Sequence, residues 1–421
     1  MLKFGFVGFD ARIIESINHE IFDANDIFKK LENLDRGLIN LESLLDKVDV
    51  QDIEIDTYWR FKGEFDHYSS RRELPLIFEE QDLLFKYILS LSIIFVKSLD
   101  VIVFSNFPHQ GVDSVIKNCA KKYNKKLLFY TPSIFKNYCY LIEGEERNFK
   151  NLLPNKEQKS PLKDDYDSSP SQKLYYMEKE YFPKKNGLIS KLKTFNYLKK
   201  YNKTYPFRIL FKKMLVSFLH KGYRNINWLN SFRPSENKLK IYFPLHLQPE
   251  LTTSNLGGIY YDQIYALKKL CDALEKLDVS NTIYLKENPK QNEINRIFLN
   301  LFQDKSNIEF ISRNVSSSDL IDNCDLVYTI SGTAGWEAIK SGKKCLLLGS
   351  TWYETAPGVY RELKELLVDR YNEVNNASVR EWYDEHKKFL HFMQNDIAIN
   401  EMDSTINRTS KQLDALIKTY R

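Results

Sequence analysis

Long apolar runs are missing from this 421-residue sequence. The nearest candidate, YILSLSIIFV at residues 87–96, is bounded by Lys86 and Lys97 and is far shorter than the roughly 18 apolar residues of a membrane-spanning helix. The first residues, MLKFGFVGFDAR, also lack the apolar stretch and cleavage site of a secretory signal. We therefore expect a cytoplasmic protein, in which residues 87–96 form a buried helix or strand.

Patterns that bind metals or form disulfides are also missing. The sequence has five cysteines and no C-x-x-C pair, which argues against both a disulfide framework and a zinc site. Its seven histidines form neither H-E-x-x-H nor H-x-H, and no D-x-D pair is placed at a strand end in the second half. We expect reduced core cysteines, no bound metal and no cofactor.

Acidic residues are missing from 181–235, which holds thirteen lysines or arginines. Apolar residues recur there at helical spacing, which predicts one or two basic amphipathic helices broken near Pro206. Such a segment could dock on an anionic membrane face, hold an anionic glycan or lipid-linked acceptor, or be a solvated basic helix face. Nucleic acid is not expected, because no recognised nucleic-acid motif is present.

The length of the chain fits two domains, and its pattern indicates α/β folding in both. Residues 100–133 read as strand, helix and strand, and after residue 237 strands and helices alternate to about 350. We predict two Rossmann-like, doubly wound parallel-sheet domains that face a cleft, in the manner called GT-B. The predicted segments are 1–150, a first such domain; 151–236, a basic linker or helical segment; 237–355, a second such domain; and 356–421, helices that pack back on the first.

The clearest motif is DLVYTISGTAGWEAIKSGKKCLLLGS, residues 325–350. A strand that ends at Ile330, small residues at Ser331 and Gly332, and a helix that starts near Thr333 would present free backbone N–H groups to a phosphate. Thr333 could cap the helix or bond a phosphate oxygen, and Gly335 would let the phosphate approach. Glu337, one turn into the helix, suits a ribose diol. An ordinary tight turn with a solvated glutamate remains the alternative.

Two further loops follow predicted strands of the same sheet and should lie on the same edge. The loop in FPLHLQPELTTSNLGG, 243–258, gathers His246, Gln248, Glu250 and Thr253 for hydrogen bonding to a ligand. In YLKENPK, 284–290, Lys286 could neutralise a phosphate. The alternatives are a surface loop with an incidental histidine and a solvated lysine.

Together these three segments resemble the donor-binding domain of bacterial capsule polysaccharide biosynthesis glycosyltransferases, which include Kdo transferases that use a CMP-activated sugar. Lys286, Ser331, Thr333 and Glu337 match the family's motifs, whereas Asn288 stands where the family usually has a histidine that contacts the nucleotide. The resemblance covers about 240–355 well. It implies that 237–355 binds a nucleotide sugar and that 1–150 is the acceptor side.

In the first half the resemblance is carried by FSNFPHQGVDSVIKNCAKKYNKKLLF, similar to the SN-x-PH-x-G-x-D stretch of the same proteins. His109 and Asp113 of this loop are the predicted catalytic residues, one of which would deprotonate an acceptor hydroxyl. Asp113 could instead merely cap the helix that follows. Trp352 and Tyr353 could wall the sugar site or pack in the core.

The resulting prediction is a metal-independent GT-B glycosyltransferase of capsule or lipopolysaccharide-type synthesis, in the cytoplasm or attached to the inner face of its membrane. It would transfer a sugar from a nucleotide-activated donor, such as CMP-Kdo, to a hydroxyl of a glycan or lipid-linked acceptor. Three alternatives stay open: a sugar-nucleotide epimerase, a CDP-polyol phosphotransferase, and a non-catalytic scaffold subunit of a capsule assembly complex.

Overall fold

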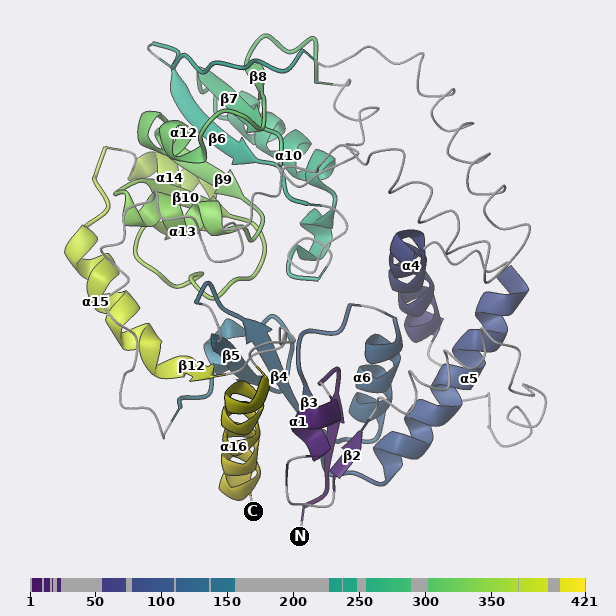
Figure 1. The fold of residues 1–421 in the computed structure, drawn as a ribbon. Helices are drawn as coiled ribbons and strands as arrows, with labels where there is room; N and C mark the ends of the chain where they lie inside the picture. Colours follow the sequence, from purple (N-terminus) through teal and green to yellow (C-terminus); the bar gives the residue numbers. More distant parts are fainter. Residues whose placement is uncertain are drawn as a thin grey trace. The chain divides into compact units, whose positions relative to one another are not determined.

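The fold was analysed in a computed structural model of the chain (Figure 1). It describes residues 2–9, 11–15, 17, 21–23, 55–72, 78–109, 111–135, 138–155, 227–236, 238–247, 255–288, 302–369, 371–392 and 402–420. The chain divides into two compact units: unit 1 is Met1–Pro161 with His386–Arg421, and unit 2 is Leu162–Glu385. The basic segment 181–235 lies largely outside the described residues, as do residues 289–301, within which the alternating pattern after residue 237 predicts a helix.

Unit 1 is built on a six-stranded sheet in the order β12-β5-β4-β3-β1-β2. Its strands are β1 (Phe4–Val7), β2 (Ile21–Asp23), β3 (Val101–Phe104), β4 (Lys126–Pro132), β5 (Tyr138–Glu143) and β12 (Leu390–Phe392). β2, β1, β3 and β4 run parallel, as predicted for a doubly wound sheet. β5 runs antiparallel to β4, and β12 antiparallel to β5. Only five residues join β4 to β5, too few for the crossover that a parallel partner requires.

Helices cover both faces of this sheet. They are α1 (Ala11–Glu15), α4 (Ile55–Arg72), α5 (Phe78–Lys97), α6 (Val112–Lys122) and α16 (Met402–Tyr420), with a short helix η2 at Phe149–Asn151. On one face, Leu413 and Ile417 of α16 pack with α1 against Phe4 and Phe6. On the other face α5 approaches so closely that a Cβ added at Gly5 would lie 2.9 Å from the Phe95 ring. From its sequence, VDVQDIEIDTYW at residues 48–59 is predicted to form a strand; this is wrong for its last residues, from Ile55 on, which begin α4.

Unit 2 holds a second, wholly parallel sheet in the order β11-β10-β9-β6-β7-β8. Its strands are β6 (Leu239–Pro244), β7 (Asn281–Lys286), β8 (Ile308–Ile311), β9 (Leu326–Thr329), β10 (Lys344–Leu347) and β11 (Val359–Tyr360). Numbered along the chain, this is the 3-2-1-4-5-6 order of a Rossmann sheet. The prediction of an α/β fold with two Rossmann-like sheets is therefore confirmed.

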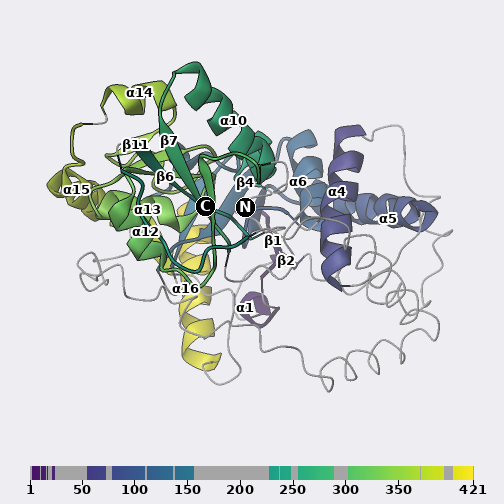
Figure 2. The same cartoon turned by 90° about the horizontal axis from the view of Figure 1, so that it is seen from above.

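The central residues of the unit 2 strands are apolar on both faces because helices lie on both sides of the sheet (Figure 2). The helices are η6 (Gly258–Tyr261), α10 (Gln263–Lys276), α12 (Ser317–Asn323), α13 (Thr333–Lys340), α14 (Leu363–Val368), α15 (Asn376–His386) and η7 (Lys387–Phe389). Ile241 and Phe243 of β6 pack on the α10 side, whereas Tyr242 between them packs against α12 and α13. α10 begins where Asp262 accepts hydrogen bonds from the N–H groups of Ile264 and Tyr265.

All five cysteines are buried and free, as the sequence predicts. Residues 87–96 lie within helix α5. Among the helices that the structure describes, none combines the length and the apolar character that crossing a bilayer demands.

Candidate functional site

The candidate site lies at the carboxyl edge of the unit 2 sheet, where β6 and β9 are neighbours. The chain leaves β6 toward β7 on one side, whereas it enters β9 from β8 and continues to β10 on the other. At such a switch point the loops that follow the two strands diverge and leave room for a ligand. The loops after β6, β7 and β9, which the sequence singles out, all follow strands at or next to this point.

His246 connects the two strands at the switch point. Its imidazole Nε2 lies 3.1 Å from the Thr329 Oγ1 at the end of β9. Its backbone N–H donates to the Gln263 Oε1 over 2.6 Å, and the Gln263 amide donates back to the His246 carbonyl over 3.0 Å. Burial lowers the pKa of His246 to about 4, so its imidazole is neutral at pH 7. It can offer a hydrogen bond to a ligand but no charge.

The glycines of the turn after β9 are required by packing. A Cβ at Gly332 would lie 2.9 Å from the His246 Cε1, and one at Gly335 would lie 2.7 Å from the Cys345 Sγ. Gly335 therefore lets α13 approach β10, which is the role of the third glycine in dinucleotide-binding turns. The prediction that Gly335 leaves space for a phosphate is wrong, because protein atoms fill that space.

Helix α13 starts without a side-chain cap. Its N-cap residue is Gly332, which has no side chain to accept a hydrogen bond from the first turn, so the predicted capping role of Thr333 is wrong. The Tyr353 hydroxyl donates to the Gly332 carbonyl and fixes the turn on its other side. An uncapped helix start of this kind can accommodate an anion. That Ser331 and Thr333 bond a phosphate stays a prediction.

Lys286 and Glu337 form the charged part of the site. Lys286 is only 6% exposed, and its ammonium donates to the Ser317 Oγ over 2.7 Å. Burial lowers the pKa of Lys286 to about 8, against the opposing effect of the Glu337 charge. Burial likewise raises the pKa of Glu337 to about 7, against the effect of the Lys286 charge. Two side chains that titrate near neutral pH within one electrostatic pair are characteristic of binding or catalytic sites.

Sequence reasoning did not identify Ser317 and Tyr242, which support Lys286. Ser317 is the first residue of α12, and its Oγ accepts the Lys286 ammonium together with the Tyr242 hydroxyl, the latter over 3.2 Å. Ser317 is 31 residues from Lys286 and 75 from Tyr242, so no local pattern connects them. Only the parallel pairing of β6 with β7, and the placement of α12 beside them, brings these groups together.

Asn288 has a structural partner of its own. Its side-chain amide donates to the Leu245 carbonyl over 3.1 Å and so links the loops that follow β7 and β6. Leu245 in turn donates its N–H to the Lys286 carbonyl over 2.9 Å. The residue that departs from the family pattern thus holds the neighbouring loop in place.

Trp352 and Tyr353 are core residues. They are 6% and 0% exposed, and Trp352 packs on Trp336 with the ring centroids 4.7 Å apart. Trp382 and Tyr383 of α15 complete this aromatic cluster. Of the two readings of Trp352 and Tyr353, core packing is confirmed, because no ring that is buried among other aromatics can stack on a sugar.

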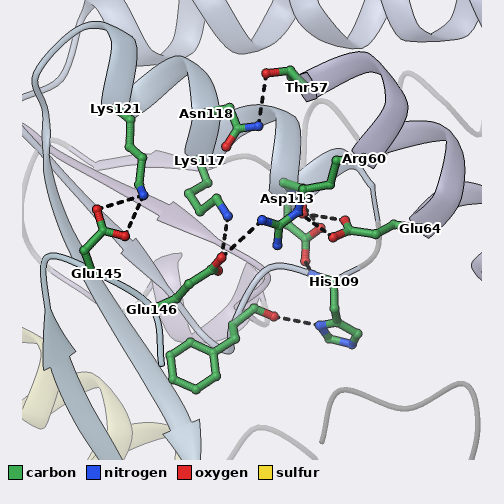
Figure 3. A network of polar contacts seen from close by, with 12 residues as sticks. Thr57, Arg60, Glu64, His109, Asp113, Lys117, Asn118, Lys121, Glu145 and Glu146 are labelled. Atoms are coloured by element: carbon green, nitrogen blue, oxygen red, sulfur yellow. Dashed lines mark hydrogen bonds and ion pairs between the residues drawn. The ribbon is translucent and has the colours of Figure 1, made fainter. Parts of the chain in front are cut away.

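In unit 1, His109 lies in the loop between β3 and α6, and Asp113 lies in the first turn of α6 (Figure 3). The His109 Nδ1 is 2.7 Å from the Phe107 carbonyl oxygen, which can only accept, so Nδ1 carries a proton and Nε2 is the basic nitrogen. Asp113 accepts the backbone N–H groups of His109 and Ser114, over 3.0 and 2.9 Å. Its carboxylate therefore holds the backbone of the loop. This is close to the capping role that the sequence offered as the alternative, although the N-cap of α6 is Gly111.

The remaining predicted ligand residues, Gln248, Glu250 and Thr253, lie outside the described residues. Within the part of the chain that the structure describes, no three histidine, cysteine, aspartate or glutamate side chains gather as metal ligands.

Comparison with known proteins finds a family similarity within unit 2. Residues 242–375 match the family model described as capsule polysaccharide biosynthesis protein. The matched residues run from β6 to the end of β11 and beyond, so they include His246, Lys286, Thr333 and Glu337. No curated protein matches the chain.

Solved structures resemble the chain only distantly. The beta Kdo 2,4 transferase of Thermosulfurimonas dismutans KpsC is 12% identical, with a TM-score of 0.33, over 75% of this chain and 88% of its own. The beta Kdo 2,7 transferase of the same protein is 10% identical, with a TM-score of 0.37, over 99% of both chains. The UDP-GlcNAc 2-epimerase of Methanocaldococcus jannaschii is 12% identical, with a TM-score of 0.27, over the full length of both chains. At such scores the solved structures carry no argument, and what the comparisons show is that residues 242–375 are similar to capsule polysaccharide biosynthesis proteins.

Proposed function

We propose that this protein is a glycosyltransferase of bacterial surface polysaccharide synthesis. Unit 2 binds a nucleotide-activated sugar, of the CMP-Kdo kind or another nucleotide sugar, and unit 1 activates a hydroxyl of a glycan or lipid-linked acceptor. One observation supports this above all others: Lys286 and Glu337 are paired beside the His246–Thr329 contact, at the switch point of a Rossmann sheet in the family-matched region.

The proposed reaction is a displacement at the anomeric carbon of the donor. The acceptor oxygen forms a bond to that carbon while the bond from the carbon to the phosphate oxygen breaks, and the nucleotide leaves with the electron pair. Lys286 and the amides at the start of α13 stabilise the negative charge that develops on the phosphate. The His109 Nε2 takes the proton of the acceptor hydroxyl and later releases it to water.

The roles of the remaining site residues follow from this reaction. Glu337 binds the ribose hydroxyls, and the uncharged imidazole of His246 forms a hydrogen bond with the nucleotide. Asp113 acts through the loop that it holds rather than as the base. No metal or cofactor takes part in the proposed reaction, and the basic residues of 181–235 attach the enzyme to an anionic membrane surface or to its acceptor.

A thermal-shift panel with CMP, CDP, UDP and GDP tests the donor site. At a concentration 100 times the Kd, a nucleotide should stabilise the protein by about 2.7 kcal/mol. One of the four should raise the Tm of the wild type and raise it less in Glu337→Ala, whereas Glu365→Ala, an exposed control on α14, should respond as the wild type does. If no nucleotide raises the Tm at millimolar concentration, the proposal is wrong.

The acceptor and membrane parts are tested separately. With an active donor, His109→Gln should abolish transfer without changing the thermal shift. Flotation with anionic liposomes should separate the wild type from a variant in which the lysines of 181–235 are neutralised. Equal flotation would exclude membrane attachment through this segment.

A further inference from the structure

Helix α4 contributes a carboxylate to the His109 loop, although it lies far away in the sequence. The Glu64 Oε2 accepts the backbone N–H of Gly111 over 3.1 Å and also the Ser114 hydroxyl. Gly111 has a φ of +87°, a conformation that disfavours other residues, and it forms the N-cap of α6. Glu64 therefore fixes the Gly111 bend and the first turn of α6 that follows it.

The other oxygen of Glu64 is held by a chain of ion pairs (Figure 3). The Arg60 Nε donates to the Glu64 Oε1 over 2.8 Å, and its Nη1 donates to the Glu146 Oε1 over 3.2 Å. Glu146 also accepts the ammonium of Lys117 over 2.6 Å. Lys117 and Glu146 have side chains that are 2% and 8% exposed, so solvent screens this contact weakly.

The imidazole of His109 extends away from these carboxylates (Figure 3). Neither Glu64 nor Asp113 bonds the ring. Asp113 holds the backbone of His109 before the bend, and Glu64 holds the backbone of Gly111 after it. The ring direction and the Nδ1–H tautomer thus depend on the backbone, through the contact of Nδ1 with the Phe107 carbonyl.

We propose that Glu64 is a positioning residue for His109: from helix α4 it clamps the Gly111 bend, and with Asp113 it fixes the loop in which the Nδ1 of His109 donates to Phe107 and Nε2 is left as the base. The inference rests on the proposed function in that Nε2 serves as the base for the acceptor hydroxyl. The contacts of Glu64 with Gly111 and Ser114, called the clamp below, can be measured without any substrate.

Two measurements on the full-length protein test the clamp. Amide hydrogen exchange of residues 105–114 should be at least about tenfold faster in Glu64→Ala, because a hydrogen bond from an amide to a charged acceptor is worth about that factor. Spectra of protein labelled with ¹⁵N-histidine should show the Nδ1–H form of His109 in the wild type and a mixture of tautomers in the variant. A His109→Gln protein assigns the signal.

Two further variants sharpen the test. Glu64→Gln keeps one acceptor oxygen but cannot serve Arg60 and the bend together, so its exchange should be intermediate. Glu145→Gln removes a carboxylate that pairs with Lys121 on the same helix α6, over 2.7 Å and largely in solvent, and should leave the loop as it is in the wild type. If Glu64→Ala unfolds unit 1 as a whole, Glu64→Gln decides alone.

Unchanged exchange at 105–114 and an unchanged tautomer in Glu64→Gln would overturn the proposal, even if the enzyme transfers sugar. Conversely, failure of every nucleotide to bind would remove the proposed function only. The positioning role of Glu64 would still be decided by the exchange and tautomer measurements, which need no nucleotide. When a donor is known, Glu64→Gln should lower kcat at least about tenfold and leave the donor KM unchanged, because it touches only the acceptor side. A KM that rises with kcat unaffected would contradict the positioning role.

Discussion

Replacing Glu337 by glutamine should make unit 2 more stable, and increasingly so as the pH rises. The raised pKa of Glu337, about 7 against an ordinary 4.5, means that the folded protein disfavours the ionised form. The contribution of such a group to the stability of the fold is complete below pH 4.5, the pKa in the unfolded chain. It is lost progressively as the pH rises through 7, the pKa in the folded protein. At 1.36 kcal/mol per pKa unit, ionisation costs the native state about 3 kcal/mol at pH 8 and about 1 kcal/mol at pH 5.

Glutamine resembles the protonated glutamate in shape and stays neutral, so Glu337→Gln avoids this cost. Its advantage in unfolding free energy should therefore grow by about 2 kcal/mol between pH 5 and pH 8. Urea unfolding followed by tryptophan fluorescence suits the measurement, because Trp228, Trp336, Trp352 and Trp382 all lie in unit 2. Glu365→Gln, an exposed control, should show no such trend. Parallel pH curves for Glu337→Gln and the wild type would refute the argument that burial opposes the Glu337 charge.

Three further predictions concern the same unit. An anionic ligand should raise the pKa of Lys286 from about 8, so nucleotide binding at pH 8 should take up about half a proton per site. Calorimetry in buffers of different ionisation enthalpy measures this uptake. Binding enthalpies that are the same in all buffers would contradict the prediction. Gly335→Ala should lose about 1–3 kcal/mol of stability, because the added Cβ clashes with Cys345. Gly63→Ala on α4 is the control: no atom lies within 4 Å of the added Cβ, so its stability should be unchanged or higher. Equal changes in stability for the two variants would show that α13 can shift to relieve the clash. Trp352→Ala should lose about 3–5 kcal/mol in urea unfolding, and a variant of normal stability with weakened donor binding would instead place this ring in the sugar site.

The strand and helix order of unit 2 could be predicted because each local pattern agrees with the fold. Its strands are short and mainly apolar, and α10 is long, amphipathic and capped by Asp262. In unit 1 the local pattern misleads at Ile55 and Tyr58, which read as strand but belong to helix α4. The short strands β2 and β12, of three residues each, are defined by pairing with distant partners, and no sequence window reveals such pairing.

The residues of the candidate site also fall into two groups: those that a local sequence pattern predicts and those that only the tertiary fold brings together. Lys286 and Glu337 could be predicted because each ends or follows a strand of a parallel sheet, whose carboxyl ends share one edge. Ser317, Thr329 and Glu64 could not, since their roles arise from contacts that the tertiary fold makes. The role of Gly335 was predicted wrongly, and that of Trp352 stayed open between binding and packing, for a related reason: a small residue or an aromatic ring near a site serves packing as readily as binding.

The placement of charge gives a reason to regard this edge of unit 2 as a binding site and not as a structural corner. A buried Lys286, which among the described residues bonds a serine hydroxyl and lies beside a glutamate that is itself costly to ionise, destabilises the folded protein at neutral pH. Apolar side chains of similar size at these two positions would fill the same space without that cost. A phosphate reverses the balance, because it gives Lys286 a stronger counter-charge than Glu337 does and, by raising the pKa of Glu337, favours the neutral carboxylic acid beside it. The two groups are thus destabilising in the free protein and favourable only with an anionic ligand present, as expected where stability has been exchanged for binding.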